Sequence, residues 1–356
     1  MVYLDYAATA PMRPEVLMAM HEAEEKYYAN ASALHTPGHL AMNQVEKTRE
    51  LLAEIIGALP EEIIFTSGAS EANNTVVWTF AGHEIETSPL EHHSILETAK
   101  LYSGDAKPKL YSYMLANNET GEILDLDTIT LKAHAVGDFV HSDLTQALGK
   151  IPIDVHALDL DYATFSAHKI GGPVGVGGLY VRKGAPFKPL IIGGNQEKKR
   201  RGGTYNVVGI VGFGAALKML KDNDSATNYA TNVAKLRNTL AQRILAEIPG
   251  SSLNTDIRSG KSLPNILNAS FRAAEGESIQ LYLDAEGIIV STGSACAAGD
   301  TKPSHVLMAK TGDAEVAHSS IRFSFGPDNT IADVERVMAV LPGIVDRLQK
   351  ISTIDL

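Results

Sequence analysis

The chain has 356 residues, of which 44% are hydrophobic and 21% charged, and its formal net charge is −11. This composition is typical of a folded globular protein and argues against disorder. The single cysteine excludes a disulfide framework and an all-cysteine zinc site, and it fits a reducing compartment. The acidic balance disfavours nucleic-acid binding, and no stretch reaches the ~18 apolar residues of a membrane span. We therefore expect a soluble cytoplasmic protein that binds neither nucleic acid nor membrane.

Predicted strands and helices alternate through the body of the chain. Short apolar runs bounded by turn residues predict strands at 62–65, 110–116, 139–142, 162–166 and 178–181. A helix is expected to begin near Ser70, whose hydroxyl can cap it, and another is expected over 127–137. This alternation predicts an α/β fold with a mixed, mostly parallel sheet covered on both faces.

The C-terminal part of the chain predicts a different arrangement. Strands at 265–271, 288–291 and 320–325 combine with helices at 278–285 and 331–347. This α+β pattern indicates a second, smaller domain. We expect residues 13–253 to form a large domain, and residues 1–12 and 254–356 to form the small one.

Three predicted strands end in residues that suit a ligand, and ligands of α/β proteins bind beyond the carboxyl ends of strands. Residues 67–70 offer backbone N–H groups at a helix start, which suits a phosphate. Asp143 follows one strand and Lys169 follows another. A phosphate cradle, a carboxylate and an amine at neighbouring strand ends suit pyridoxal 5′-phosphate. There the lysine forms the Schiff base and the aspartate keeps the ring nitrogen protonated.

Short motifs over nearly the whole chain carry a family resemblance. They lie at 4–9, 30–35, 65–73, 91–94, 117–121, 142–146, 165–173, 201–204, 291–296 and 319–324. In this order they resemble the class V aminotransferase group of pyridoxal-phosphate enzymes, and within it the NifS/IscS-type cysteine desulfurases. The resemblance implies the fold type I architecture of these transferases, with a seven-stranded type of sheet in the large domain and a small α+β domain.

The resemblance implies a role around the cofactor for each matching residue. Lys169 looks like the Schiff-base lysine and Asp143 like the partner of the pyridine nitrogen; the plainer alternatives are a surface lysine and a helix cap. His92 would stack on the ring and move protons, whereas the adjacent His93 is expected to be structural. The remaining contacts are expected from Gln146 and Asn118 at the ring hydroxyl, and from Ala69, Ser70, Ser166 and His168 at the phosphate.

Other matching residues point to the substrate and to a second subunit. Thr204 resembles the threonine that reaches the phosphate of the neighbouring subunit, which implies a homodimer. The basic run at 198–201 either flanks that interface loop or faces an acidic sulfur acceptor. Arg322 resembles the arginine that binds the substrate carboxylate, a partner that suits a guanidinium fork, although an ordinary strand-edge arginine is the alternative. Asn30 and His35 lie in the substrate-side segment.

Cys296 decides which activity the resemblance implies. It is the one cysteine of the chain and lies in a segment of Ser, Gly and Ala after a predicted strand. Such a loop is small and mobile, so the thiol can move between a buried substrate and an outside acceptor. A buried apolar cysteine is the alternative, but polar and glycine neighbours make poor core material.

We therefore expect a pyridoxal-phosphate-dependent cysteine desulfurase that converts L-cysteine to L-alanine and leaves a persulfide on Cys296. Lys169, Cys296 and His92 are the expected catalytic residues. The sulfur would pass to an acceptor protein, either an iron–sulfur scaffold or a tRNA thiolation enzyme. The alternatives are a selenocysteine lyase or a small-amino-acid aminotransferase of the same family, or a non-catalytic partner that binds a sulfur acceptor.

Two segments, 78–87 and 101–110, are shorter than the resemblance predicts. The family has a further strand and helix here, so we expect a sheet element to be lost, at a cost to cofactor retention or dimer contacts. Other cofactors fit less well. The histidines lack metal-ligand spacing beside carboxylates, and residues 175–178 do not form a dinucleotide fingerprint because Tyr180 occupies the last glycine position.

Overall fold

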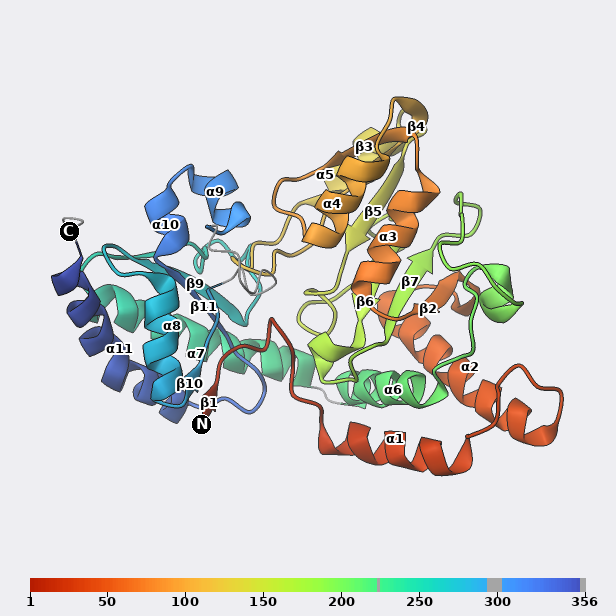
Figure 1. Ribbon diagram of the computed structural model, residues 1–356, viewed down its shortest axis with the longest axis horizontal. Helices are drawn as coiled ribbons and strands as arrows, with labels where there is room; N and C mark the ends of the chain where they lie inside the picture. The colour runs from red at the N-terminus through yellow and green to blue at the C-terminus, as the bar shows by residue number, and fades with distance from the viewer. Residues whose placement is uncertain (223–224, 293–302, 353–356) are drawn as a thin grey trace. The chain divides into compact units, whose positions relative to one another are not determined.

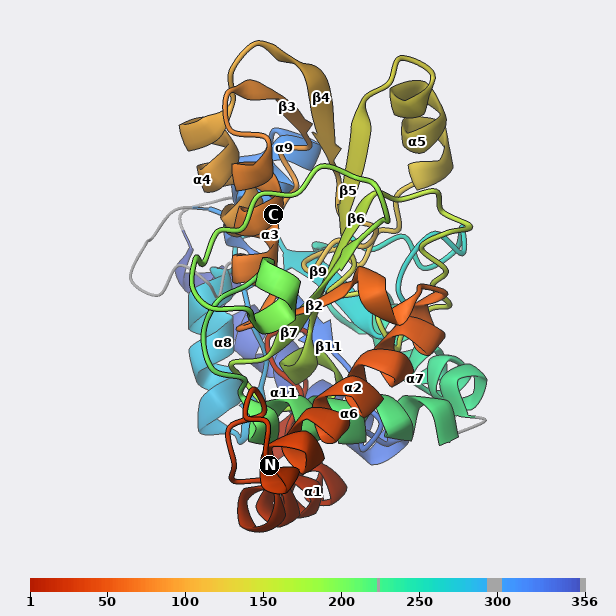
Figure 2. The same cartoon turned by 90° about the vertical axis from the view of Figure 1, so that its right-hand side faces the viewer.

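The computed structural model describes residues 1–222, 225–292 and 303–352. Its contacts divide the chain into two compact units, whose elements are labelled in Figures 1 and 2. The sheet unit comprises Pro11–Leu115 and Asp125–Asp224. The C-terminal unit comprises Met1–Ala10, Ala116–Leu124 and Ser225–Leu356.

The sheet unit is built on one six-stranded sheet. The strands lie in the order β2 (Ile63–Thr66), β7 (Gly177–Val181), β6 (Tyr162–Ser166), β5 (Phe139–Asp143), β4 (Ala106–Ser112) and β3 (His83–Thr87). Strands β3, β4, β5 and β6 run parallel to one another, and β7 runs antiparallel to both β6 and β2, between which it lies. The predicted α/β fold with a mixed, mostly parallel sheet is confirmed, with six strands where the resemblance implies seven.

Helices cover both faces of this sheet. They are α1 (Pro14–Lys26), α2 (Thr36–Ile56), α3 (Ala69–Thr79), α4 (His93–Tyr102), α5 (Leu126–His134) and α6 (Val207–Asp222), with short 3-10 turns η1 (Pro60–Glu62), η2 (Ala167–Ile170) and η3 (Gln196–Lys199). Figures 1 and 2 show α3 and α4 on one face and α5 on the other. Every residue of β2, β6 and β7 is buried, as expected for strands packed on both sides.

Two sequence predictions in this unit were wrong in detail. Helix α3 begins at Ala69 after Gly68, and within the described residues no side chain caps it, so Ser70 is not the cap. Gly68 has φ 152°, which favours glycine at this turn. Strand β4 covers Ala106–Ser112 instead of 110–116. The first residues of β4 are polar, and Lys107 and Lys109 form ion pairs with glutamates of β3. A search for apolar runs therefore misses the start of this strand.

The segments predicted to be shortened hold ordered structure at the edge of the sheet. Strand β3 lies within 78–87, and β4 begins within 101–110. All five residues of β3 are half-buried. Charged side chains on an exposed edge strand discourage pairing with another chain, and β3 carries Glu84 and Glu86.

The C-terminal unit combines a small antiparallel sheet with helices. Strands β11 (Ser320–Ser324), β9 (Ile266–Phe271) and β8 (Ser251–Leu253) form the sheet, and β1 (Val2–Tyr3) pairs in parallel with β10 (Ile288–Ile289). The helices are α7 (Ser225–Glu247), α8 (Gly276–Ala285), α9 (His305–Thr311), α10 (Ala314–His318) and α11 (Ile331–Ile351). Fully buried aromatic side chains, Phe271, Phe323 and Phe325, form the centre of its core.

The compact units differ from the expected domains at three places, the smallest being residues 11–12, which belong to the sheet unit. Helix α7 belongs to the C-terminal unit because Leu240, Ala241 and Ile244 are buried in that unit's core, although we expected the boundary near residue 254. Residues 116–124 also join this unit, where the Ile123 N–H donates to the Lys261 carbonyl. The domain assignment from the sequence stays a prediction. Within the residues that the structure describes, no helix has the length and apolar character needed to cross a bilayer.

Candidate functional site

Asp143 lies at the carboxyl end of β5, as predicted, and its carboxylate is held by two donors. The Asn73 side-chain amide donates to Oδ2 at 2.8 Å, and the Thr145 N–H donates to Oδ1 at 2.9 Å. Asp143 is 7% exposed. A carboxylate fixed in this way offers a stationary negative charge that suits a cation at the strand end.

Lys169 follows the neighbouring strand β6 in the η2 turn. The pairing of Asp143 with Thr164 places the ends of β5 and β6 side by side. Lys150 Nζ donates to the Lys169 carbonyl at 3.0 Å, which anchors the turn. Burial and the charge of Lys169 together lower the pKa of Lys150 to about 8. A second amine thus lies close to the predicted Schiff-base lysine, and the sequence did not suggest it.

Ser166 and the start of α3 come together around Gly177. Both Thr66 of β2 and Ser166 of β6 pair with Gly177 of β7, and a Cβ on Gly177 would lie 2.7 Å from Gly68 Cα. This close backbone approach brings the N–H groups at the start of the 11-residue helix α3 next to the end of β6. A helix N-terminus beside a serine hydroxyl is suited to an anion.

His168 and the predicted anion residues share this region. Burial, reinforced by the positive charge of Lys169, lowers the pKa of His168 to about 4, so its ring is neutral at pH 7. Ala69 and Ser70 form the first turn of α3. The structure therefore brings Ala69, Ser70, Ser166, His168, Lys169 and Asp143 to one end of the sheet.

His92 lies at the N-cap of α4, where its ring is part of the cap. The Ser94 N–H donates to His92 Nδ1 at 3.1 Å, and Ser94 Oγ lies 2.8 Å from the same nitrogen. The neighbouring His93 is exposed and begins the helix. The cap therefore fixes the orientation of the His92 ring.

Two buried titratable groups near Asp143 were missed from the sequence. His141 lies on the same face of β5, two residues before Asp143, with Ser112 Oγ 2.9 Å from Nδ1 and Thr164 Oγ1 3.0 Å from Nε2. Burial, partly opposed by the charge of Asp143, lowers the pKa of His141 to about 4. Glu91 accepts from the Met114 N–H at 2.8 Å. Burial raises its pKa well above the usual range, and Asp143 adds to that effect. Only its contacts reveal His141, which lies in none of the motifs, whereas Glu91 begins the motif at 91–94 but had no role assigned to it.

The remaining predicted residues of the sheet unit lie in loops. Gln146 is 7% exposed, three residues after Asp143. Asn30 is exposed between α1 and α2, where its Oδ1 accepts from the Ser32 N–H at 2.9 Å. Thr204 is exposed between Gly203 and Tyr205, which line a small pocket.

The C-terminal unit carries Arg322 and Asn118 together. Arg322 Nη1 donates to the Asn118 carbonyl at 2.9 Å, and Nη2 donates to Asp5 Oδ1 at 2.8 Å. Within the described residues, Arg322 Nε has no hydrogen-bond partner although it is buried. An available guanidinium donor suits a carboxylate ligand. Cys296 lies outside the described residues.

The arrangement can bind an anion, hold a cation and supply an amine at one sheet end of one unit. Among the described residues there is no group of three or more His, Cys, Asp or Glu side chains that could hold a metal ion. The groups at the sheet end of the first unit are amines, a carboxylate, imidazoles and hydroxyls.

A family model described as aminotransferase class-V matches residues 2–107 and 101–337. The chain belongs to this family. The two matches overlap at residues 101–107, inside the segment predicted to be shortened. Relatives that resemble this chain over nearly its full length are cysteine desulfurases. Cysteine desulfurase IscS of Dictyoglomus turgidum is 39% identical over 383 aligned residues, covering 99% of this chain and 96% of that relative.

Solved structures of NifS-like proteins are also similar to this class-V chain. The NifS-like protein from Rickettsia africae superposes with a TM-score of 0.89 at 31% identity, covering 97% of this chain and 99% of that one. SspA, solved in complex with cysteine, has a TM-score of 0.79 at 30% identity, with 93% and 100% coverage. The predicted relationship to NifS/IscS-type enzymes is confirmed.

Proposed function

We propose that this protein is a pyridoxal-phosphate-dependent cysteine desulfurase that releases L-alanine and passes sulfur to an acceptor protein. The observation that carries the proposal is the placement of Asp143 at the end of β5 and of Lys169 just after the neighbouring strand β6, with a helix start suited to an anion beside them. Two relatives support the choice of substrate, since one is named a cysteine desulfurase and another was solved with cysteine.

The residues at the sheet end fit the cofactor. The buried hydroxyl of Thr145, two residues after Asp143, has no hydrogen-bond partner among the described residues. In the part of the chain that the structure describes, no side chain caps the start of α3, so its first N–H groups suit an anion. In this proposal Ala69, Ser70, Ser166 and His168 hold the phosphate, Asp143 and Gln146 hold the ring, Asn118 lies near it, and Thr204 serves the neighbouring subunit of a homodimer.

When bound, pyridoxal phosphate supplies an electron sink for negative charge at the α-carbon of an amino acid. Lys169 Nζ is the group that takes the α-proton, because it is the amine that follows β6 beside Asp143. Asp143 keeps its negative charge fixed because Asn73 and Thr145 both donate to it. The His92 ring moves protons near the substrate sulfur.

In this proposal Arg322 and Asn30 bind the substrate, and Cys296 takes up its sulfur. Arg322 binds the cysteine carboxylate through its spare Nε–H, with Asn30 as a further substrate contact. The thiolate of Cys296 then attacks the substrate sulfur. A sulfur–sulfur bond forms, the carbon–sulfur bond breaks, and its electron pair takes up a proton at the carbon that becomes the methyl of alanine. Cys296 is left as a persulfide. The acceptor is a scaffold for iron–sulfur assembly or a tRNA thiolation enzyme, and the cytoplasmic location stays a prediction.

The test is to record the visible spectrum of the purified protein with pyridoxal phosphate, and then to add L-cysteine with a reductant. The proposal expects a yellow protein that releases sulfide and alanine in equal amounts. Lys169→Ala should abolish both products, and Cys296→Ala should abolish sulfide while the colour remains. Equal turnover by Cys296→Ala would favour an aminotransferase. A chain that takes up no cofactor would overturn the proposal and favour a non-catalytic partner.

A further inference from the structure

Asn73 is a buried amide whose two hydrogens are both used. It lies on α3 and is fully buried. Its Nδ2 donates to Asp143 Oδ2 at 2.8 Å and to Ser94 Oγ at 2.9 Å. An amide NH2 group has two hydrogens, so these contacts account for both. Because a carboxylate only accepts, the contact with Asp143 decides which end of the amide faces it.

The oxygen of the Asn73 amide contrasts with its nitrogen. Within the described residues, its Oδ1 is buried and has no hydrogen-bond partner. An unsatisfied buried acceptor is destabilising, and such groups in folded proteins call for an explanation. An apolar residue of similar size, such as leucine, would avoid the cost of this unsatisfied acceptor. The amide is therefore suited to this position by its donors, and not by its contribution to the core.

Ser94 extends the chain of hydrogen bonds from Asn73 to His92. A serine hydroxyl has one hydrogen, and its oxygen accepts from Asn73, so that hydrogen is available to His92 Nδ1 at 2.8 Å. The Ser94 N–H donates to the same nitrogen at 3.1 Å. Two donors pointing at Nδ1 require it to be unprotonated, which leaves the hydrogen of the neutral ring on Nε2.

We propose that Asn73 is a positioning residue that joins Asp143 and His92 into one hydrogen-bonded unit. Its amide orients the Asp143 carboxylate and, through the Ser94 hydroxyl, keeps the proton of the neutral His92 ring on Nε2. The inference deepens the proposed function, on which the roles of Asp143 and His92 rest. The hydrogen bonds themselves lie within the polypeptide, so they can be tested apart from catalysis.

The first test uses the full-length protein, labelled with nitrogen-15 in histidine and free of cofactor. Long-range proton–nitrogen spectra distinguish the two tautomers of each ring, and the His92 signal is identified by its loss in His92→Gln. Wild type should show the Nε2–H tautomer alone. Asn73→Ala should give a measurable fraction of the Nδ1–H form, because the Ser94 hydroxyl can then turn and accept from the ring.

The chain offers a matched control in the next residue. Asn74 lies on the same helix, and its Nδ2 donates to the Ser94 backbone carbonyl at 2.8 Å, not to the hydroxyl. Asn74→Ala should leave the His92 tautomer unchanged. Ser94→Ala provides a second route if Asn73→Ala does not fold, because it removes the hydroxyl and leaves Asn73 in place. It should shift the same His92 signal.

The second test measures the affinity of the protein for pyridoxal phosphate by its absorbance band. Asn73→Ala should weaken binding by about ten- to a hundredfold, as expected for a lost hydrogen bond to a charged group. Asn74→Ala should bind as wild type does. The proposal is overturned if Asn73→Ala and Ser94→Ala both keep the wild-type His92 spectrum, or if Asn73→Ala keeps the wild-type affinity. A shifted His92 tautomer in a protein that releases no sulfide would retain this inference and reject the proposed function.

Discussion

Arg322 on β11 and Asp5 form a partly buried ion pair across 317 residues of sequence, with Nη2 and Oδ1 2.8 Å apart. The side chains are 3% and 16% exposed. Asp5 reaches this position because it forms a bridge with Ser324, two residues after the arginine on the same strand. Asp5, in the motif at residues 4–9, therefore orients the Arg322 guanidinium. The Nε–H of Arg322 has no partner among the described residues and can donate to a ligand.

Replacing either partner should raise the KM for L-cysteine. Arg322→Ala removes the expected carboxylate ligand and should raise the KM at least a hundredfold, and Asp5→Asn should raise it about tenfold, as typical for lost charge-assisted contacts. Steady-state alanine formation measures both. Arg336→Ala is the control, since that arginine pairs with Glu286 at the surface and should leave the KM unchanged. An unchanged KM in Arg322→Ala would remove the arginine from the substrate site.

Gly177→Ala should disrupt the anion-binding end of the sheet. The added Cβ would lie 2.6 Å from the Phe165 carbonyl oxygen and 2.7 Å from Gly68 Cα, and backbone atoms cannot move aside as a flexible side chain can. We expect a loss of about 1–3 kcal/mol in the free energy of unfolding and weaker cofactor binding. Denaturant titration and absorbance measure the two effects.

The control for this substitution is Gly343→Ala in α11, where an added Cβ meets nothing within 4 Å. It should stabilise the protein by about 0.5–1 kcal/mol, because alanine favours a helix. Wild-type cofactor affinity in Gly177→Ala would show that the close approach of β7 to Gly68 is not needed for the site.

A buried ion pair should hold the loop before Thr204 in its unusual conformation. Glu197, Lys198 and Lys199 have φ of 46°, 55° and 68°, and such left-handed residues cost roughly 1–2 kcal/mol each. Glu197 accepts two hydrogen bonds from Arg49, at 2.7 and 2.8 Å, and both side chains are buried.

Glu197→Gln should therefore lower the free energy of unfolding by about 3–5 kcal/mol, because it leaves the Arg49 charge buried without its main partner. Chemical denaturation measures this loss. Glu46→Gln is the matched control, because Glu46 contacts the same arginine from a 46% exposed position and its loss should cost about 0–1 kcal/mol. Similar losses in the two variants would contradict the structural role of the buried pair.

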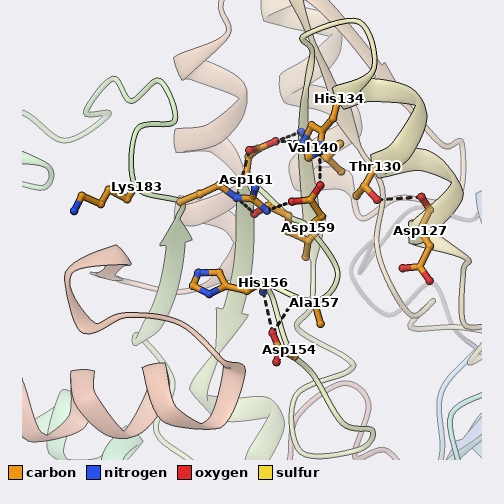
Figure 3. A network of polar contacts seen from close by, with 12 residues as sticks. Asp127, Thr130, His134, Val140, Asp154, His156, Ala157, Asp159, Asp161 and Lys183 are labelled. Atoms are coloured by element: carbon orange, nitrogen blue, oxygen red, sulfur yellow. Dashed lines mark hydrogen bonds and ion pairs between the residues drawn. The ribbon is translucent and has the colours of Figure 1, made fainter.

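His134 should make stability depend on pH. Figure 3 shows its ring between Asp159 and Asp161, with Nδ1 2.7 Å and Nε2 2.8 Å from their carboxylates. Burial alone would lower the pKa of His134, but the hydrogen bonds and charges of the two aspartates outweigh it and raise the pKa. A raised folded-state pKa stabilises the fold below the unfolded value of ~6.5, and that stability is lost as pH rises through the folded value.

His134→Gln should consequently lower the urea midpoint more at pH 6 than at pH 9. His21→Gln is the control, since His21 lies in an exposed pair with Glu25 and should leave the midpoint unchanged at both values. Equal effects of His134→Gln at the two pH values would mean that the aspartates do not stabilise the charged ring.

Strand and helix predictions succeeded where apolar residues alone define the element. Strand β6 matches the prediction residue for residue because all five of its positions are buried. The prediction failed at β3 and at the start of β4, where lysine and glutamate pair across an edge. Pairs of this kind need both strands, and neither strand by itself shows an apolar pattern.

The sequence alone determined the kinds of chemical group at the strand ends and their order along the chain: the amine of Lys169, the carboxylate of Asp143 and the start of a helix. Only the tertiary structure decided which side chains form hydrogen bonds or ion pairs with the functional groups and so orient them. Asn73 meets Ser94 and Asp143 across 21 and 70 residues, and Arg322 meets Asp5 across 317. Hydrogen bonds and ion pairs act over about 3–4 Å, so their partners are set by how sheet and helices pack and not by distance along the chain.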